Sequence, residues 1–512
     1  MAVITIQNTG QKICCNDGDN LLRVLLAHGI FVDNPCNGTG VCGKCKVRID
    51  GAGICLSCMT QVREELTIEL LQKERKHRVL TKGYMPEFEF ANYENGYGIA
   101  VDIGTTTVVM ALIDLQTGEE IANASRINAQ KQFGLDVLTR ITYEYNHGEA
   151  GIQELQKTIV DSMNEMLEEL VGADESLRNQ IKEIVVAANC TMTHMLLGVD
   201  ARSIGRAPYA PVFREAQECL ASAIGLRAGE ETKLYCLPQV SSYIGADIVA
   251  GAYVCELEKE AGNVLFIDIG TNGEIVLASK GKLLSCSCAA GPALEGMNIS
   301  CGMRAAEGAI EDVVISEEGV QVKTIGDLEP VGLCGSGILA VVRELIQKGF
   351  LKKTGALIQP DSLKEDDWKR SVLRAVSKQR EAVLCRDQEI IVTQDDIRQV
   401  QLAKGAILSG FTALLKKAEI SMRELDKVLI AGQFGAHLPA ESLVGVGILP
   451  EQVKEKLVYV GNSSKTGAYM ALMSKKVRQE MELLAEKIEY FELAETTDYE
   501  RVFAESMRFP VK

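Results

Sequence analysis

The sequence predicts a protein in two parts, a small α+β unit at the N-terminus followed by a larger α/β module made of two lobes. Two observations support this division. Seven of the 16 cysteines lie within the first 58 residues, and the letters DIGT follow an apolar run twice later in the chain, at Asp102 and Asp268. At 512 residues the chain is long enough for about three domains.

Composition excludes several classes of protein. The chain is 46% hydrophobic, no run approaches the ~18 apolar residues of a membrane span, and the start MAVITIQNTG lacks the layout of a signal peptide. We therefore expect a cytoplasmic protein whose cysteines are reduced thiols with metal or redox roles. A net charge of −16, without a long basic stripe, argues against nucleic acid as a partner.

The N-terminal part has the pattern of a few strands packed around one helix. Alternating or apolar runs predict the strands, and Asp19 is placed to cap the helix. The predicted elements are strands over residues 2–7, 13–16, 45–49 and 66–70 and a helix over 21–28. With a cysteine loop between the helix and the next strand, they form a β-grasp unit over residues 1–75.

The cysteine loop has the spacing Cys36-x5-Cys42-x2-Cys45-x12-Cys58. This is close to the C-x4-C-x2-C…C pattern of plant-type 2Fe–2S clusters, and the glycines of PCNGTGVCGKC let the backbone wrap closely around a cluster. The alternative is zinc held by Cys42-x2-Cys45 and Cys55-x2-Cys58, but the pairs of zinc sites more often stand roughly 15–20 residues apart. We predict Cys36, Cys42, Cys45 and Cys58 as the metal ligands, with Cys55 as a rival for the fourth position.

The rest of the chain divides at a charged run, QKERKHR, and at the two DIGT turns. We expect a linker over residues 76–96, a first lobe over 97–262, a second lobe over 263–490 and a C-terminal tail over 491–512. In YGIAVDIGTTTVVMALID (97–114) and FIDIGTNGEIVL (266–277), each strand ends in aspartate and turns through glycine and threonine into a second strand.

Such a turn is suited to phosphate, because its backbone amides and hydroxyls can close on phosphate oxygens, while the aspartate can hold Mg²⁺ through water. One DIGT would also fit an ordinary hairpin, but two at the starts of similar halves indicate a shared nucleotide site. A third turn, VLIAGQFGAH (428–437), suits a nucleoside. The G-x-x-x-x-G-K-[ST] sequence of a P-loop does not occur.

The paired VDIGTTT and IDIGTNGE turns with AGQFG resemble the ASKHA fold of sugar kinases, Hsp70 and actin. Joined to an N-terminal 2Fe–2S domain, they resemble the reductive activators of corrinoid proteins, which use ATP to return cob(II)alamin to cob(I)alamin. Further stretches with this resemblance are VVAANCTMTHMLLG, CAAGPALEG, VGLCGSGIL and YVGNSSKTGA. Larger members carry an extra middle domain, and the short linker leaves no room for one here.

The resemblance implies the site residues. The first phosphate turn comprises Asp102, Gly104, Thr105 and Thr106, the second comprises Asp268, Gly270, Thr271 and Gly273, and the adenosine turn comprises Gly432, Gln433 and Gly435. Asp102 and Asp268 count as catalytic. Asp247 either orients a water or the metal, or is a capping or core-edge residue. Glu295 and the turn 335–337 stay ambiguous, and His194 is expected to be a satisfied core histidine.

The resemblance also implies the function: an ATP-hydrolysing activase with a 2Fe–2S cluster, ATP and Mg²⁺, which passes an electron to a corrinoid carried by a partner protein. An upstream electron donor is implied, and a homodimer is possible on these grounds. Three alternatives remain open: an activator of another low-potential enzyme, a small-molecule kinase with a redox-sensing ferredoxin domain, and a nucleotide-gated electron carrier without turnover.

Overall fold

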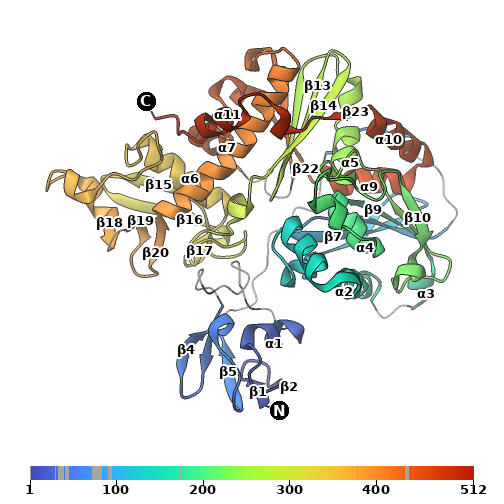
Figure 1. Ribbon diagram of the computed structural model, residues 1–512, viewed down its shortest axis with the longest axis horizontal. Helices are drawn as coiled ribbons and strands as arrows, with labels where there is room; N and C mark the ends of the chain where they lie inside the picture. Colours follow the sequence, from blue (N-terminus) through green and yellow to red (C-terminus); the bar gives the residue numbers. More distant parts are fainter. Residues whose placement is uncertain are drawn as a thin grey trace.

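The computed structural model of the chain describes residues 2–28, 30, 32, 40, 45–71, 84–89, 95–172, 175–376, 379–432 and 438–511. Figure 1 shows a small N-terminal unit beneath two larger α/β lobes. Within the described ranges, no helix is both long and apolar enough to cross a membrane.

The N-terminal unit is a mixed five-stranded sheet packed against one helix, in the order β2-β1-β5-β3-β4. The apolar residues at alternate positions of its strands are buried in one core. The helix cap differs from expectation: the side chain of Asn20, not Asp19, accepts the Arg23 N–H, while Asp19 accepts the Asn16 N–H. The elements are β1 (Ala2–Ile6), β2 (Lys12–Cys15), α1 (Leu21–Ala27), β3 (Lys46–Ile49), β4 (Gly53–Leu56), η1 (Ser57–Met59) and β5 (Leu66–Leu70).

The first lobe is built on a six-stranded sheet in the order β10-β11-β9-β6-β7-β8. Strands β11, β9 and β6 run parallel, and β6-β7-β8 form an antiparallel meander. The long helix α2 is kinked at Gly148, where φ is +59°. The elements are β6 (Tyr97–Ile103), β7 (Thr107–Asp114), β8 (Glu120–Ile127), α2 (Val137–Val171), α3 (Glu175–Asn179), β9 (Ile181–Ala188), α4 (Cys190–Leu197), β10 (Gln217–Leu220), β11 (Lys233–Cys236) and α5 (Ala246–Val254).

The second lobe repeats this plan with the order β22-β21-β12-β13-β14-β23. Again three parallel strands adjoin a meander, β12-β13-β14, so the repeat predicted from the two DIGT turns is confirmed at the level of the fold. The elements are β12 (Val264–Ile269), β13 (Gly273–Ser279), β14 (Lys282–Cys288), η6 (Pro292–Glu295), α7 (Gln394–Lys417), β21 (Lys427–Ala431), α8 (Ala440–Val446), β22 (Leu457–Gly461), α9 (Ser463–Met473), α10 (Lys475–Lys487), β23 (Ile488–Tyr490) and α11 (Tyr499–Ser506).

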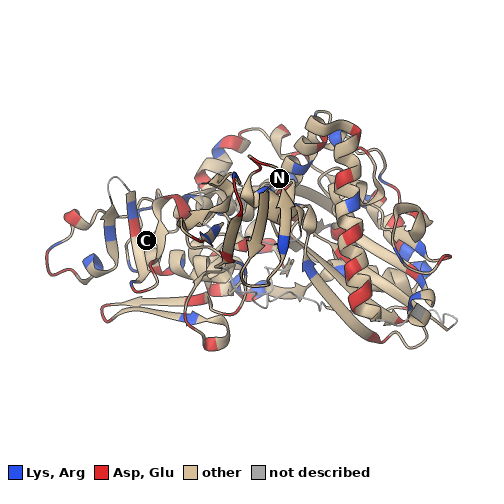
Figure 2. Ribbon diagram, turned by 90° about the horizontal axis from the view of Figure 1, so that it is seen from below, with Lys and Arg blue, Asp and Glu red and all other residues tan. Residues whose placement is uncertain are grey.

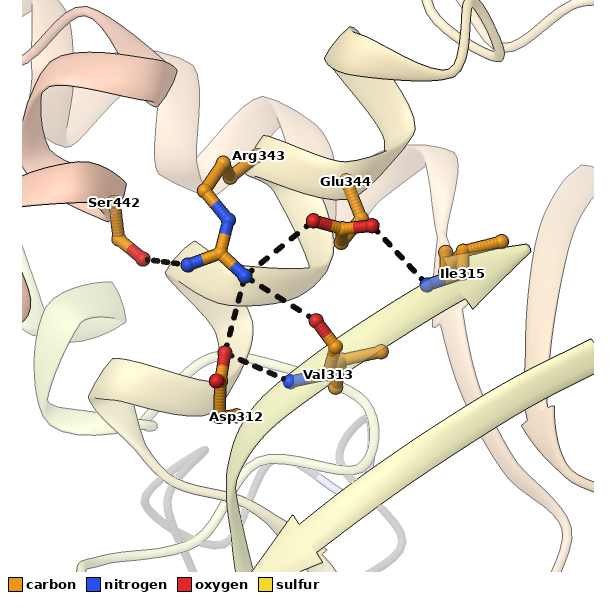
Figure 3. A network of polar contacts seen from close by, with 6 residues as sticks. All are labelled: Asp312, Val313, Ile315, Arg343, Glu344 and Ser442. Carbon is orange, nitrogen blue, oxygen red and sulfur yellow. Dashed lines mark hydrogen bonds and ion pairs between the residues drawn. The ribbon is translucent and has the colours of Figure 1, made fainter.

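An insertion between η6 and α7 adds two three-stranded sheets and the helix α6. Arg343 on α6 holds this insertion to the lobe, because its guanidinium donates to Ser442 on α8 and to the Asp312 carboxylate and Val313 carbonyl on β15 (Figure 3). The beginning of α6 lies against η6, because a Cβ added at Gly335 would be 1.9 Å from the Leu294 carbonyl oxygen. The elements are β15 (Ala309–Ser316), β16 (Gly319–Thr324), β17 (Gly332–Leu333), α6 (Gly335–Gln347), β18 (Leu373–Val376), β19 (Gln379–Cys385) and β20 (Ile390–Thr393).

The lobes share a core between them. Helix α5 packs against α9, and α9, although it follows a strand of the second lobe, lies on β6 and β9 of the first. Helix α10 is clamped to the first lobe by the buried Arg478–Glu183 ion pair, with 2.7 Å between Nη1 and Oε1, yet leads into β23 on the second sheet. The last helix, α11, lies in the segment treated in the sequence as a tail, and it packs on α7.

The connection between the N-terminal unit and the first lobe is attached to the lobes over residues 84–89. The Tyr84 N–H donates to the Val460 carbonyl on β22 at 2.7 Å, and Phe88 meets Tyr469 edge-on. Among the residues that the structure describes, Figure 2 shows acidic and basic ones interspersed over the face seen from below, without a continuous basic stripe.

Candidate functional site

The cysteine site is described at two of its four predicted ligands. Cys45 and Cys58 are both buried, and the Ser57 N–H donates to the Cys45 carbonyl at 2.8 Å, which holds the two cysteines side by side in the backbone. Cys36 and Cys42 lie outside the described residues. Cys55 sits within β4, opposite Val47, so Cys58 is the better placed of the two rivals.

Asp102 is the penultimate residue of β6, one position from the predicted end of the strand, and it is tied to the beginning of α9. Its two carboxylate oxygens accept hydrogen bonds from the Asn462 amide and the Ser464 hydroxyl, each at 2.8 Å. Burial raises the pKa of Asp102, and these two donors and Lys465 act in the opposite direction. Both oxygens therefore already have protein partners, which gives Asp102 a holding role between the two halves of the chain.

The rest of the first turn is also fixed by side chains. Asn128 donates to the Gly104 carbonyl at 2.9 Å, and Asn189, the N-cap of α4, donates to the Thr105 hydroxyl at 3.0 Å. The fully buried guanidinium of Arg140 donates to the Thr105 carbonyl at 2.5 Å. Among the described residues, Arg140 has no carboxylate hydrogen-bond partner, so its positive charge stays available to the electrostatics of this turn.

The second turn, by contrast, leaves room. The nearest atom to a Cβ added at Gly270 would be the Asn272 carbonyl oxygen at 3.6 Å, so nothing of the described chain fills the space beside it. Gly432, at the end of β21, has φ +92°, and a Cβ there would lie 2.5 Å from Asp268 Oδ1. Gly273 has no space for a side chain, because its Cβ would meet the Cys288 sulfur at 2.8 Å. Gln433 and Gly435 lie outside the described residues.

The two turns meet at Glu295, which lies on η6 and is 2% exposed. The Thr106 hydroxyl of the first turn donates to Glu295 Oε2 at 2.8 Å, and the Thr271 hydroxyl of the second donates to Oε1 at 2.5 Å. The two hydroxyl oxygens are 3.4 Å apart. The structure thus brings together two threonines that stand 165 residues apart in the chain.

A cluster of carboxylates lies beside these turns, formed by Asp247, Asp268 and Glu274 with Asp102 nearby. They keep some accessible surface; Asp102 and Asp247 belong to the first lobe, and Asp268 and Glu274 to the second. Burial, together with Asp247 and Asp102, raises the pKa of Asp268 to about 8, and burial with Asp102 raises that of Asp247 to about 7. Burial, Asp247 and Asp268 raise the pKa of Glu274 well above its usual range.

A divalent cation would relieve the repulsion between these neighbouring carboxylates, and Mg²⁺ prefers oxygen ligands. Over the described part of the chain, no three acidic, histidine or cysteine side chains converge on one metal position. That arrangement is compatible with a Mg²⁺ ion that keeps several of its waters, as it usually does. The carboxylate cluster and the space at Gly270 therefore fit a Mg²⁺–phosphate group.

Sequence reasoning missed five residues of this site: Arg140, Asn189, Glu274, Asn462 and Ser464. Glu274 carried a signal, since it pairs directly with Asp268 across the β12–β13 hairpin. The others lie far away along the chain.

The structure shows the surroundings of two residues that were not assigned to the site from the sequence. His194 is fully buried; its Nδ1 lies 2.8 Å from the Cys190 carbonyl and its Nε2 3.1 Å from the Val212 nitrogen, so it is a satisfied core histidine, as expected. Gly335 begins α6, directly against the Leu294 carbonyl.

Three family descriptions match successive parts of the chain. Residues 1–73 match the 2Fe-2S iron-sulfur cluster binding domain, 97–260 match the RACo middle region, and 262–512 match the C-terminal domain of RACo, the ASKHA domain. The expectation that the family's middle domain is missing is therefore wrong, because the first lobe itself is the middle region, directly after a short linker.

Relatives cover most of the chain. Corrinoid activation enzyme RamQ of Eubacterium limosum is 31% identical over 410 residues, spanning 78% of this chain and 69% of that protein. The [Co(II) methylated amine-specific corrinoid protein] reductase of Methanosarcina barkeri is 24% identical over 423 residues, 77% of this chain and 73% of that protein.

A solved structure extends the likeness to the full length. The reductive activator for corrinoid, iron-sulfur protein superposes with a TM-score of 0.73 at 29% identity, over 100% of this chain and 99% of that one. Because the domain order, the facing turns and the sequence all agree along the chain, it belongs to the family of reductive activators of corrinoid proteins.

Proposed function

We propose that the chain is an ATP-dependent reductive activator, which passes an electron from its 2Fe–2S cluster to the cob(II)alamin of a partner corrinoid protein and so restores cob(I)alamin. The observation that carries this proposal is the meeting of both DIGT turns at Glu295, in a chain that begins with a cluster-binding domain. The activities named for its relatives support the same partner class.

At the N-terminal unit, Cys36, Cys42, Cys45 and Cys58 would hold the cluster. Four thiolates suit this cluster type, and the Ser57–Cys45 hydrogen bond favours Cys58 as the fourth ligand. When bound, such a cluster supplies single electrons at low potential, about −400 mV for the plant type. An upstream donor must reload it after each transfer.

Between the lobes, the residues divide the work on nucleotide. Thr105, Thr106, Gly270 and Thr271 would face phosphate, and Gly432 with Gln433 and Gly435 the adenosine. Asp247, Asp268 and Glu274 would hold the waters around Mg²⁺, with Asp268 best placed to take a proton from the attacking water because its carboxylate has no hydrogen bond from the described chain. Asp102 positions α9.

ATP is needed because reducing Co(II) in a corrinoid is uphill. Each 100 mV of uphill transfer costs about 2.3 kcal/mol per electron. Nucleotide can offset this only if it binds two conformations unequally, and a 100-fold preference supplies about 2.7 kcal/mol. Helices α9 and α10 contact both lobes, so a nucleotide-dependent change in how the lobes sit would act through these two helices.

The test uses the full chain, loaded with its cluster, mixed with a corrinoid protein in the cob(II)alamin state. The absorbance of cob(I)alamin should rise with Mg·ATP and a reductant, and it should fail to rise with Cys45→Ser or with Asp268→Asn. If the Asp268→Asn protein reduces the corrinoid as well as the wild type, ATP hydrolysis is not coupled to electron transfer. The lobes would then be better explained as a kinase.

A further inference from the structure

The carboxylate of Glu295 takes a hydrogen bond from one threonine of each turn. A threonine hydroxyl has a single proton to donate. In this state the protons of both Thr106 and Thr271 are therefore directed at the carboxylate, and neither is available to another acceptor. We call this three-residue contact the clasp.

The clasp uses the donors that a nucleotide would need. Thr106 and Thr271 belong to the turns that are proposed to hold phosphate, so the inference rests on the proposed function. A phosphate oxygen and a carboxylate oxygen are both anionic acceptors, and at close range they repel one another. Glu295 thus takes the place of an anion between the two lobes.

The backbone fixes Glu295 in this place. The Gly291 N–H, just before η6, donates to the Thr271 carbonyl at 2.9 Å. After η6, Gly296 has φ +75°, and a Cβ there would lie 2.1 Å from the Met303 carbonyl oxygen. Because both ends of η6 are held by such close contacts, the backbone that carries Glu295 is fixed, and only a change of side-chain rotamer can take its carboxylate away from the two threonines.

The surroundings of the clasp act in opposite directions on the pKa of Glu295. Burial raises the pKa of Glu295, while the hydrogen bonds from Thr271 and Thr106 and the charge of Arg304 lower it. A second anion entering this space would meet the same donors and the same cation.

We propose that Glu295 is a positioning residue that clasps the two turns when nucleotide is absent and competes with nucleotide phosphate for the hydroxyl protons of Thr106 and Thr271. Nucleotide binding then moves at least one donated hydrogen bond from the carboxylate to phosphate. The Thr106–Glu295 hydrogen bond joins the two lobes, so its transfer to phosphate removes a contact between them and links occupancy of the site to movement of the lobes.

The test is Glu295→Gln in the full, cluster-loaded chain, with Mg·ATP as the probe in calorimetry. Removing the negative charge and one acceptor should tighten binding about tenfold. Without nucleotide, the amides of both turns should exchange hydrogen faster than in the wild type, and Mg·ATP should restore their protection. Glu344→Gln on α6 is the matched control, a buried glutamate that accepts the Ile315 N–H, and it should leave the affinity unchanged (Figure 3).

Equal or weaker binding by Glu295→Gln overturns the competition. Glu295→Asp, one methylene shorter, reaches at most one threonine and should also bind more tightly, so the proposal stays testable if the glutamine variant does not fold. A wild type that fails to bind Mg·ATP refutes the proposed function itself, whereas a wild type that binds beside a variant without gain refutes the clasp alone.

Discussion

The two DIGT turns share their letters and their place at the end of a central strand, yet their aspartates are held in opposite ways. Asp102 has both oxygens bonded, to Asn462 and Ser464. Asp268 accepts no hydrogen bond from any described residue, and its pKa is raised to about 8 by burial and by the neighbouring carboxylates.

This difference shows how a duplicated unit can divide its roles. In the first turn, the carboxylate, the carbonyls and the hydroxyls are taken up by side chains from several elements, so the turn is part of the connection between the lobes. In the second turn the carboxylate is unbonded beside Asp247 and Glu274, and the space at Gly270 is open. We infer that the first turn holds the site in shape and that the second carries its chemistry.

The largest effect should come from Asp268→Asn. Asparagine keeps the size of the side chain but cannot accept a proton, so the rate of ATP hydrolysis should fall at least about 100-fold. The visible spectrum of the cluster should be unchanged, because the cysteines lie in a separate unit. Steady-state phosphate release and calorimetric Mg·ATP binding would show the loss of turnover with binding retained.

The matched substitution, Asp102→Asn, should affect stability instead. The asparagine oxygen can still accept from the Asn462 amide, and its NH2 then faces the Ser464 hydroxyl, which must turn from donor to acceptor. Two hydrogen bonds to a carboxylate become neutral ones, so the free energy of unfolding should drop by about 1–2 kcal/mol. Thermal unfolding checks this. If Asp102→Asn abolishes hydrolysis at unchanged stability, the two turns do not differ as argued.

A smaller effect concerns pH. The folded pKa values of Asp268 and Asp247, about 8 and about 7, lie above the usual value of 3.8. At a pH between the unfolded and the folded pKa values, the folded state therefore binds more protons than the unfolded state. Their contribution to stability is present at low pH and is lost as pH rises from about 4 to about 8. Without Mg²⁺, the Tm should therefore be several degrees lower at pH 8.5 than at pH 6, and Mg·ADP should recover part of it.

Other groups titrate in the same range, including Glu144 on α2, whose pKa burial raises to about 7. The comparison is therefore made with Asp268→Asn, whose Tm should fall less steeply over this interval. Equal slopes for the two proteins would contradict a raised pKa at Asp268.

Sequence reasoning predicted the features that depend on residues close together in the chain. Cysteine spacing predicted the ferredoxin-like unit, and two DIGT turns predicted two lobes, because each is a property of neighbouring residues. Glu274 was within reach too, since an antiparallel hairpin places it opposite Asp268. The helix cap was wrong by one residue because Asp19 and Asn20 are both good caps, and only the backbone angles decide between them.

The rest depends on contacts across the chain. Asn462 lies 360 residues from Asp102, and Glu295 lies 189 from Thr106, so no local pattern indicates that they meet. The helical segment after β22 is divided at Ser474, whose φ of −150° ends α9, so that α10 can turn toward the first lobe. The six residues on either side of Ser474 contain no glycine or proline to signal the break.

The smallest effect on the fold, and a direct test of the comparison, is expected from one glycine in each turn. In Gly270→Ala the new methyl group meets only the Asn272 carbonyl oxygen, at 3.6 Å, so the Tm should stay within about 1 °C of the wild type. The methyl group would nevertheless fill the space proposed for phosphate, and Mg·ATP should bind about tenfold more weakly.

In Gly104→Ala the methyl group lies 3.1 Å from the Thr107 carbonyl oxygen, so the backbone must shift and the Tm should fall by a few degrees. Calorimetry and thermal unfolding on the pair separate the two roles. Unchanged Mg·ATP affinity in Gly270→Ala would mean that phosphate does not use the second turn, and the chemistry would then have to lie at the first.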